Sequence, residues 1–392
     1  MAVKGVFASD SGIVGDRKGD FATALLVTQP TGSAPLLALT SGMESAGAGD
    51  IVVTWFEENH FSGRINATNS AGTGASVIVD DVTGTVVGTI YMVEASGEHM
   101  FVTSISGSTL TVERGFAGTS VVTFDGSGTV VPIQRIGTAQ EEGSAKPTAI
   151  AFLGAPIYNY MQIFRNAWDV TGTDRKVEWH TGDVVAKNKR DAGVLHAEDI
   201  ERSLLFGRRS IGVQNNKPFR TMNGIIPQIS TNATSQSTDV QYTDLRDWLK
   251  DVFARNIKGK PNERIAFCGN TVLSVLDTLA MTWGTMNLSP GETEFGMEIT
   301  KWRTPFGTIS LMTHPLMNES ALWTKDLYVL HPGALRTRYL RKTHEDRNDR
   351  DGTRAGVDAD YGVFTTEMCM ELRAELTAGK YTGIDTADTS NL

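Results

Sequence analysis

"VAKNKRDAGVLHAEDIERSLLFG", Val185 to Gly207, is the stretch on which the fold interpretation depends. Ala197, Ile200 and Leu204 follow one another at helical spacing, which places them on one side of a helix. Gly207 stands where the C-terminal end of such a helix is expected. The stretch therefore predicts one long helix with a single apolar face.

The chain that follows mixes helix and strand patterns. "TDLRDWLKDVFARNI", Thr243 to Ile257, carries an apolar stripe typical of an amphipathic helix. Runs rich in β-branched and aromatic residues predict strands at residues 264–269, 306–314, 326–331 and 361–377. The part of the chain from the long helix onward is therefore predicted to be α+β.

The chain before the long helix has a different texture. Residues 1–50 are rich in small residues and predict an extended arm, and residues 50–59 predict a strand. Between residues 75 and 140, short Val, Ile and Thr runs are interrupted by glycines about every ten residues, as in a small barrel or sandwich. Strand character resumes at residues 157–170. The β-module is therefore predicted to lie between the two arms of one long hairpin.

"GEHMFVTSISGSTLTVERGFAGT", Gly97 to Thr119, predicts a hairpin inside this module, with a turn at residues 106–108. Its charged residues are Glu98, His99, Glu113 and Arg114. Because neighbours in a strand point to opposite faces, neither adjacent pair can face one cleft. We expect these four residues to be exposed charges. The aromatic residues expected in the core of the module are Tyr91, Phe101, Phe116 and Phe124.

Composition limits the classes of function. The 392 residues carry a net charge of −9, which argues against non-specific binding of nucleic acid through neutralisation of its phosphates. Cys268 and Cys369 are the two cysteines, so there is no disulfide framework, and a reducing, cytosolic origin is expected. The sequence contains no run of 18 or more apolar residues, so it predicts no membrane-spanning helix.

Motifs for catalysis and metal binding are weak. No serine has glycine on both sides at the spacing of a nucleophile elbow, and the Gly-Lys pairs lack the Ser or Thr of a phosphate loop. "HAE" at residues 196–198 lacks the cysteines of a zinc deaminase, so His196 is expected on the helix surface. "RNDRDGTRAGVD" at residues 347–358 matches a calcium loop only in part and predicts a charged, mobile loop. We expect no catalytic, cofactor or metal residues.

Residues 336–354 are locally basic, with seven Arg or Lys and four Asp or Glu. Two interpretations are open: a solvated loop, or a strip of ion pairs between subunits. The candidate inter-subunit contacts are Glu98, Glu113, Arg114, Arg336, Arg338, Arg341, Arg347 and Arg350.

The order of these parts resembles the major capsid protein of tailed double-stranded DNA bacteriophages, the Hong Kong 97-type fold. The resemblance implies an α+β fold with the following parts: an N-arm at 1–50, an E-loop hairpin at 51–180, a peripheral domain at 181–235 and 346–392 with a spine helix at 183–207, and an axial domain at 236–345. It also implies that a subgroup feature is present, a small all-β barrel inserted in the E-loop at about 72–142.

The segments that carry the resemblance are spread over most of the chain. They are "GEHMFVTSISGSTLTVERGFAGTS", "IYNYMQIFRNAWDV", "DIERSLLFG" followed by "RTMNGIIPQI", and "TPFGTISLMTHPLM". The assembly domain that some relatives carry ahead of the N-arm has no room here, which implies a separate scaffolding protein or none. No motif places the Lys–Asn cross-link of other relatives.

The resemblance implies a structural protein of the virion capsid, assembled in the host cytoplasm as pentamers and hexamers into an icosahedral shell around double-stranded DNA. Its implied partners are copies of itself, a portal, a scaffolding protein and a cement or decoration protein, with weak non-specific contact to packaged DNA and no membrane. Two alternatives are an encapsulin-like compartment and a carbohydrate-binding β protein. The latter would need paired carboxylates and an aromatic platform in the module.

Overall fold

The computed structural model describes residues 44–58, 63–68, 72–124, 130–150, 153–179, 182–237, 239–283, 288–290, 300–347 and 358–387. These residues form two units. One unit is Phe56–Pro156, and the other is made from the described chain on both sides of that segment. Most of the expected N-terminal arm, residues 1–43, lies outside the described residues, as does most of the expected charged loop, residues 348–357.

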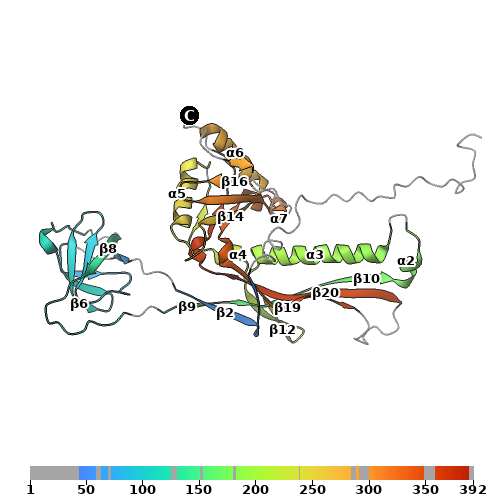
Figure 1. Ribbon diagram of the computed structural model, residues 1–392, viewed down its shortest axis with the longest axis horizontal. Helices are drawn as coiled ribbons and strands as arrows, with labels where there is room; N and C mark the ends of the chain where they lie inside the picture. The colour runs from blue at the N-terminus through green and yellow to red at the C-terminus, as the bar shows by residue number, and fades with distance from the viewer. Residues whose placement is uncertain are drawn as a thin grey trace, which may run out of the picture. The chain divides into compact units, whose positions relative to one another are not determined.

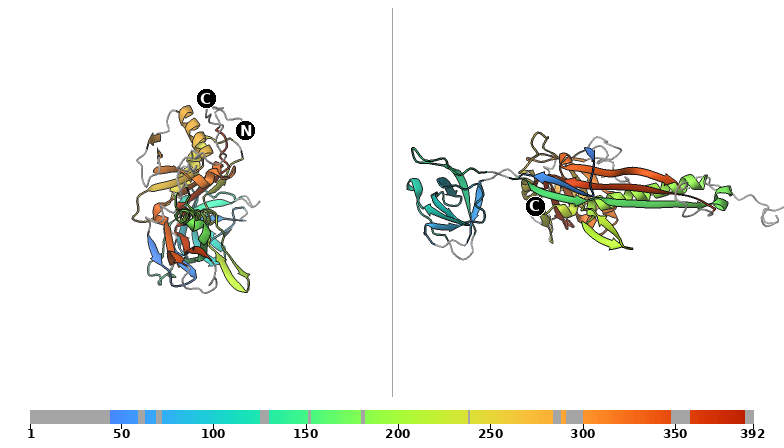
Figure 2. Two further views of the ribbon diagram at one scale, coloured as in Figure 1. Left: turned by 90° about the vertical axis from the view of Figure 1, so that its right-hand side faces the viewer. Right: turned by 90° about the horizontal axis from the view of Figure 1, so that it is seen from below.

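A long helix lies along a four-stranded sheet in the larger unit (Figure 1). The helix is α3 (Val184–Phe206), and the strands, in spatial order, are β1 (Ser45–Gly47), β19 (Leu335–Arg347), β20 (Ala359–Leu372) and β10 (Gln162–Thr171). β20 pairs antiparallel with both β19 and β10, and β1 pairs parallel with β19. Seen from below, α3 follows the same direction as these long strands (Figure 2).

Helix α3 confirms the predicted long helix almost residue for residue. Asp183 caps its start by accepting a hydrogen bond from the Val185 amide. Gly207 ends it, although not by a left-handed turn: a Cβ there would collide with the carbonyl oxygens of Ser203 and Met222. The glycine is needed because two backbones approach closely.

One prediction about this helix is wrong. His196 is buried rather than on the surface, in a stripe with Ala192, Ile200 and Leu204 that faces the sheet. Its Nδ1 lies 2.7 Å from Asn166 Oδ1 on β10, and its Nε2 lies 2.7 Å from Thr366 Oγ1 on β20. Burial lowers the pKa of His196, with Asp199 acting weakly in the other direction. The side chain therefore links the helix to two strands as a neutral imidazole.

A second, seven-stranded sheet completes the larger unit. In spatial order its strands are β13 (Ala233–Ser235), β21 (Gly379–Thr382), β18 (Leu327–Leu330), β14 (Glu263–Cys268), β17 (Thr308–Thr313), β16 (Thr300–Arg303) and β15 (Leu288–Pro290). The helices α5 (Tyr242–Phe253) and α6 (Asn270–Trp283) pack apolar side chains against those of the sheet, and together they form one hydrophobic core. The predicted amphipathic helix is confirmed: α5 buries Leu245, Trp248, Leu249, Val252 and Phe253.

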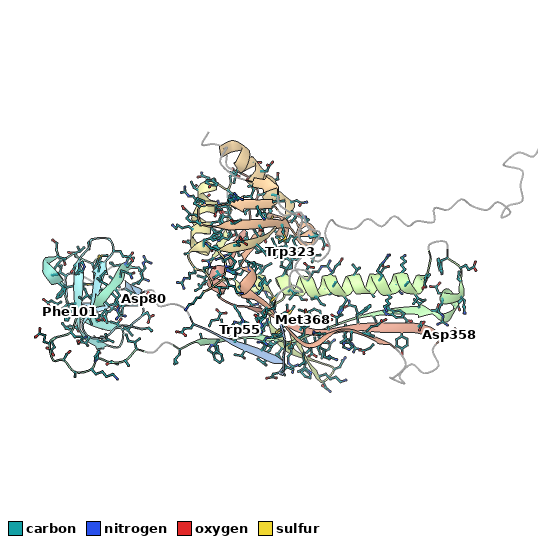
Figure 3. All side chains as sticks on the ribbon, viewed as in Figure 1. Trp55, Asp80, Phe101, Trp323, Asp358 and Met368 are labelled. Carbon is teal, nitrogen blue, oxygen red and sulfur yellow. The ribbon has the colours of Figure 1, made fainter. Side chains whose placement is uncertain are left out.

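A second core joins the two sheets. It gathers Leu204 of α3, Met368 of β20 (Figure 3) and Phe267 of β14 with other buried side chains. Short elements surround it: α4 (Ile225–Gln228), α7 (Pro315–Asn318), η2 (Trp323–Lys325), η3 (Pro332–Ala334) and η4 (Glu375–Thr377). The short helix α2 (Gly172–Lys176) lies away from this core, beside the start of α3 (Figure 1). A hairpin of β11 (Ser210–Gln214) and β12 (Lys217–Thr221) follows α3.

The predicted long hairpin is divided between two sheets. β2 (Val52–Glu57) and β9 (Ala155–Tyr160) form a two-stranded sheet, as expected for its two arms. The chain continues into β10, which pairs along its length with β20. Residues 162–171, which the sequence placed in the hairpin, therefore belong to the sheet under α3.

The smaller unit is a six-stranded barrel. Its spatial order is β3 (Arg64–Ala67), β8 (Val131–Thr138), β5 (Thr89–Val93), β6 (His99–Ser106), β7 (Thr109–Glu113) and β4 (Ser76–Ile78). The Thr68 amide donates to the Ile78 carbonyl at 2.7 Å and the Asp80 amide to the Asn66 carbonyl at 3.0 Å, so the last strand pairs with the first. The predicted limits of 72–142 omit β3, which begins eight residues before them.

The hairpin predicted within the barrel is confirmed, because β6 and β7 pair across a turn with Gly107 at φ 56°. Half of the expected aromatic core is also confirmed: Tyr91 and Phe124 are buried. Phe101 and Phe116 are half-exposed instead. Their rings stack on each other with centroids 5.2 Å apart, Phe116 being part of η1 (Phe116–Gly118).

Candidate assembly surfaces

Glu98 and Arg114 lie together inside the barrel rather than on its surface. The Glu98 side chain is fully buried and that of Arg114 is 6% exposed. The guanidinium donates two hydrogen bonds to the carboxylate, Nε to Oε1 at 2.7 Å and Nη2 to Oε2 at 2.8 Å. The backbone amides of Gly115 and Val122 also donate to this carboxylate, at 3.1 and 2.9 Å.

The prediction that Glu98 and Arg114 are exposed contact residues is therefore wrong. Burial acts to raise the pKa of Glu98, but hydrogen bonds from Arg114, Val122 and Gly115 outweigh it and hold the pKa below its usual range. The Arg114 guanidinium also lies 4.2 Å from the centroid of the Phe124 ring. This ion pair fixes the loop after β7 against the start of β6.

Glu113 and His99 are separate from that ion pair. Glu113, the last residue of β7, is exposed, as predicted. His99 is half-buried, and its backbone amide donates to Thr119 Oγ1 at 3.0 Å. The four charged residues of this stretch therefore form no common acid–base site.

The basic segment from residue 336 is a strand over the residues described, not a loop. Arg338 of β19 pairs with the fully buried carboxylate of Glu371 on β20, and Arg373 pairs with the same carboxylate at 2.7 Å. Arg341 pairs with Glu367 at 2.9 Å. Cross-strand ion pairs within one chain thus engage these arginines.

The remaining candidates lie nearer to the ends of the described segments. Arg336 pairs with Glu44 at 2.9 Å, which links β19 to the chain just before β1. Arg347 is the last residue of β19, and Arg350 lies outside the described residues. Contact of any of these residues with a neighbouring subunit stays a prediction.

Sequence reasoning missed the β11–β12 hairpin as a surface feature. Ile211 is 55% exposed, Val213 71% and Phe219 45%, although all three are apolar. The turn residues Asn215 and Asn216 both have positive φ, 50° and 58°. The available signal was the Asn215–Asn216 pair between two short strand-like runs, because a two-residue hairpin turn with positive φ at both positions favours Asn.

Sequence reasoning also missed a buried polar pair in the larger unit. His314 Nε2 lies 2.7 Å from Glu201 Oε1 of α3, with both side chains fully buried. His314 Nδ1 accepts a hydrogen bond from the Leu316 amide, so the proton lies on Nε2 and is donated to Glu201. The pair ties α3 to the start of α7 and has the character of a structural contact.

Within the described ranges, no group of three His, Cys, Asp or Glu side chains could hold a metal ion. None of the helices described is long and apolar enough to cross a membrane. A cavity of about 450 Å³ is lined by Phe206, Trp323, Asp326 and Tyr328 with six other residues. Burial raises the pKa of Asp326 and outweighs the hydrogen bond that it accepts from the Tyr328 hydroxyl at 2.7 Å.

Comparison with solved structures supports the fold. The capsid of an empty GTA particle aligns with a TM-score of 0.51 over 99% of this chain and 100% of that chain, at 7% identity. At such low identity this likeness shows the fold alone, which is the Hong Kong 97-type fold. The SrpI encapsulin of Synechococcus elongatus PCC 7942 aligns less well, with a TM-score of 0.43 over 62% of this chain and 79% of that chain, at 10% identity.

Comparison of sequences supports the family. The major capsid protein of Pseudomonas phage PaMx41 is 29% identical over 389 residues, which is 94% of this chain and 92% of that protein. Residues 8–385 match the family described as SU10 major capsid protein. Since this match spans nearly the whole sequence, the chain belongs to the SU10 major capsid protein family.

Proposed function

We propose that this chain is the structural subunit of a virion capsid, which assembles as pentamers and hexamers into an icosahedral shell around a double-stranded DNA genome. The observation that carries the proposal is the family match over residues 8–385. Repeated contacts around five- and six-fold axes close such a shell, and many modest contacts add up through multivalency. This role needs no active site, so we propose a structural protein and not an enzyme.

The larger unit supplies the two domains expected of such a subunit. We assign the peripheral domain to α3 with the four-stranded sheet, and the axial domain to the seven-stranded sheet with α5 and α6. Sheet membership supports limits that differ from those in the sequence analysis. β19 and β10 join the peripheral domain, whereas β13 and β21 join the axial domain.

We assign β2 and β9 to the E-loop and the barrel to an insertion at its end. The order of elements along the chain supports this assignment, because the barrel strands β3 to β8 all lie between β2 and β9. The edge strands of this partly closed barrel, β3 and β4, are short and are joined by two backbone hydrogen bonds, so the barrel can be presented to neighbouring capsomers with little unpaired edge for strand addition. At that position the barrel reinforces contacts between capsomers.

The proposed partners are further copies of this chain, a portal, a separate scaffolding protein and a cement or decoration protein. Assembly takes place in the host cytoplasm. An overall charge of −9 suits a wall that contains DNA with only weak, non-specific contact. The arginine strip of β19 and Glu113 stay candidates for contacts between subunits.

The two alternatives have less support. An encapsulin-like compartment would share the fold, but the family and the curated relative are phage capsid proteins. A carbohydrate-binding module would need paired carboxylates in a cleft, whereas Glu98 is held by Arg114 and Glu113 points to solvent.

The mass of the purified full chain tests the proposal. Multi-angle light scattering is expected to give five- and six-fold multiples of the subunit mass, together with much larger particles. A single species with the mass of one chain at every concentration would contradict it.

A further inference from the structure

The β11–β12 hairpin exposes apolar side chains on both of its faces. Ile211 and Val213 share one face, and Phe219 lies on the other, across from Gly212. A Cβ on Gly212 would collide with the Phe219 ring, so the ring lies directly over the glycine, yet 45% of Phe219 is still exposed. A two-stranded ribbon is marginal in water when nothing covers it. The hairpin therefore has the character of a surface that becomes covered.

The hairpin is also basic in an acidic chain. Residues 203–238 contain Arg208, Arg209, Lys217 and Arg220 but no Asp or Glu. Arg208, Arg209 and Lys217 are exposed, and Arg220 is half-buried. By contrast, residues 56–156 contain ten Asp or Glu and four Lys or Arg. Two parts of the same chain thus carry opposite charge.

The barrel offers a groove of about 430 Å³ with an apolar and hydroxyl lining. The lining residues are 83–87, Ile105 and 148–150, of which Val87 is 51% exposed and Ile150 37%. The chain around the groove carries more carboxylates than cations. Asp81 Oδ1 accepts the Thr83 amide at 2.8 Å, and Gln140 Nε2 donates to the Val87 carbonyl at 2.8 Å. The exposed Glu141 and Glu142 follow Gln140, and Lys146 is the cation of the segment that leads from them to the lining residue Thr148.

We propose that the β11–β12 hairpin of one subunit docks into this barrel groove of a neighbouring copy. The inference rests on the proposed function, because it names a contact by which subunits of one shell hold each other. Val213 and Phe219 enter the groove, while Lys217 and Arg220 face the carboxylates of Asp81, Glu141 and Glu142. Complementary charge selects this pairing and speeds encounter, and burial of the apolar side chains supplies affinity.

The same four cations would also attract DNA phosphates. The exposed aliphatic side chains decide against DNA as the occupant. Ile211 and Val213 occupy the same face as Arg220, and a phosphate backbone would leave them uncovered. A groove that has apolar walls and also carboxylates near its rim matches both the exposed aliphatic side chains and the cations of the hairpin.

Cross-linking between two kinds of subunit tests the contact. Val213→Cys is placed in one tagged full-length chain and Val87→Cys in another, and the two are co-expressed. The native Cys268 and Cys369 are fully buried, so the new thiols are the exposed ones. Because each chain carries one new thiol, a disulfide-linked pair bearing both tags can form only between copies.

The matched control replaces Val87→Cys by Ile136→Cys. Ile136 is 54% exposed, as Val87 is 51% exposed, but it does not line the groove. The expected result is a heterodimer in assembled particles for Val87→Cys, and about tenfold less for Ile136→Cys. Particles with no heterodimer, or with equal yields from both, would overturn the inference while leaving the proposed function intact. A failure to form particles would count against the proposed function itself.

Charge reversal gives an independent test. Lys217→Glu with Arg220→Glu, or Glu141→Lys with Glu142→Lys, is expected to lower the cross-link yield about tenfold, and combining the reversed partners should restore it. No rescue by the combined variant would contradict the pairing. Lys217 could also be protected from acetylation in particles and lose this protection after nuclease treatment. That result would identify DNA as the occupant and would contradict the pairing.

Discussion

Glu98 and Arg114 form a two-point ion pair inside the barrel, with N–O distances of 2.7 and 2.8 Å. Sixteen residues separate them in the chain. The same carboxylate accepts the amides of Gly115 and Val122, so one side chain organises a whole loop. Two residues that were expected to be exposed charges instead hold the barrel together at this end.

Glu98→Gln is expected to destabilise the barrel by about 3–5 kcal/mol, because it leaves the Arg114 guanidinium buried without a carboxylate. Glu113→Gln, on the exposed neighbour, should change the stability by less than about 0.5 kcal/mol. Hydrogen exchange is the measurement: the Gly115 and Val122 amides should exchange faster in Glu98→Gln. Equal exchange in both variants would show that the ion pair does not hold the loop.

The His196 network predicts a pH dependence of the larger unit. The pKa of the buried imidazole is lowered in the folded state, so the unfolded chain binds the proton more readily. The contribution of His196 is complete above about pH 6.5, the ordinary value for histidine, and is lost as the pH falls from there through the lower folded pKa.

His196→Gln should therefore flatten the fall in stability below about pH 6.5. The free energy of unfolding, measured by denaturant titration at several pH values, checks this. His344→Gln is the control, since 42% of the His344 side chain is exposed. If His196→Gln and the unchanged chain lose stability in parallel, His196 does not bind its proton in the way proposed.

Gly269→Ala is expected to destabilise the seven-stranded sheet by about 1–3 kcal/mol, because the new methyl group would collide with the backbone of Thr324. A backbone cannot move aside as a flexible side chain can. Gly47→Ala is a suitable control, since no atom lies within 4 Å of a Cβ at that position. Thermal unfolding of both variants gives the comparison, and similar midpoints would argue against close packing at Gly269.

Removing the barrel should weaken the shell without unfolding the subunit. The structure suggests cutting after Glu58 and before Leu153, with a short Gly-Ser linker, because a Cβ on Gly154 would lie 3.5 Å from the Glu57 carbonyl. The strands β2 and β9 would then be joined directly. Particles should form but break at lower temperature or denaturant concentration than intact ones. Unchanged particle stability would contradict a reinforcing role for the barrel.

Local patterns predicted the elements well. The helices α3 and α5 each have an apolar stripe at helical spacing, and the barrel strands have β-branched runs between glycines. These signals depend on residues near one another in the chain, so a sequence displays them directly. The same reasoning located the β6–β7 hairpin from its Ser-Gly-Ser turn.

Burial of charged and polar residues could not be predicted in the same way. Glu98, His196 and Glu371 have partners distant in the chain: Arg114 is 16 residues from Glu98, Thr366 is 170 from His196, and Arg338 is 33 from Glu371. The charge of Arg338 and Arg341 left open a solvated loop or a strip of ion pairs between subunits, whereas the described segment is a strand whose arginines pair with Glu371 and Glu367 on the neighbouring strand. Such partners are set by the topology of the sheet, which no local spacing reveals.

Electron cryomicroscopy of the purified full-length chain shows directly whether the chain builds a shell. We expect closed particles with icosahedral symmetry, built from rings of five and six subunits, in which the density of every subunit contains α3 lying along the four-stranded sheet. A chain that stays monomeric at all concentrations, or that forms only irregular aggregates, would contradict this expectation.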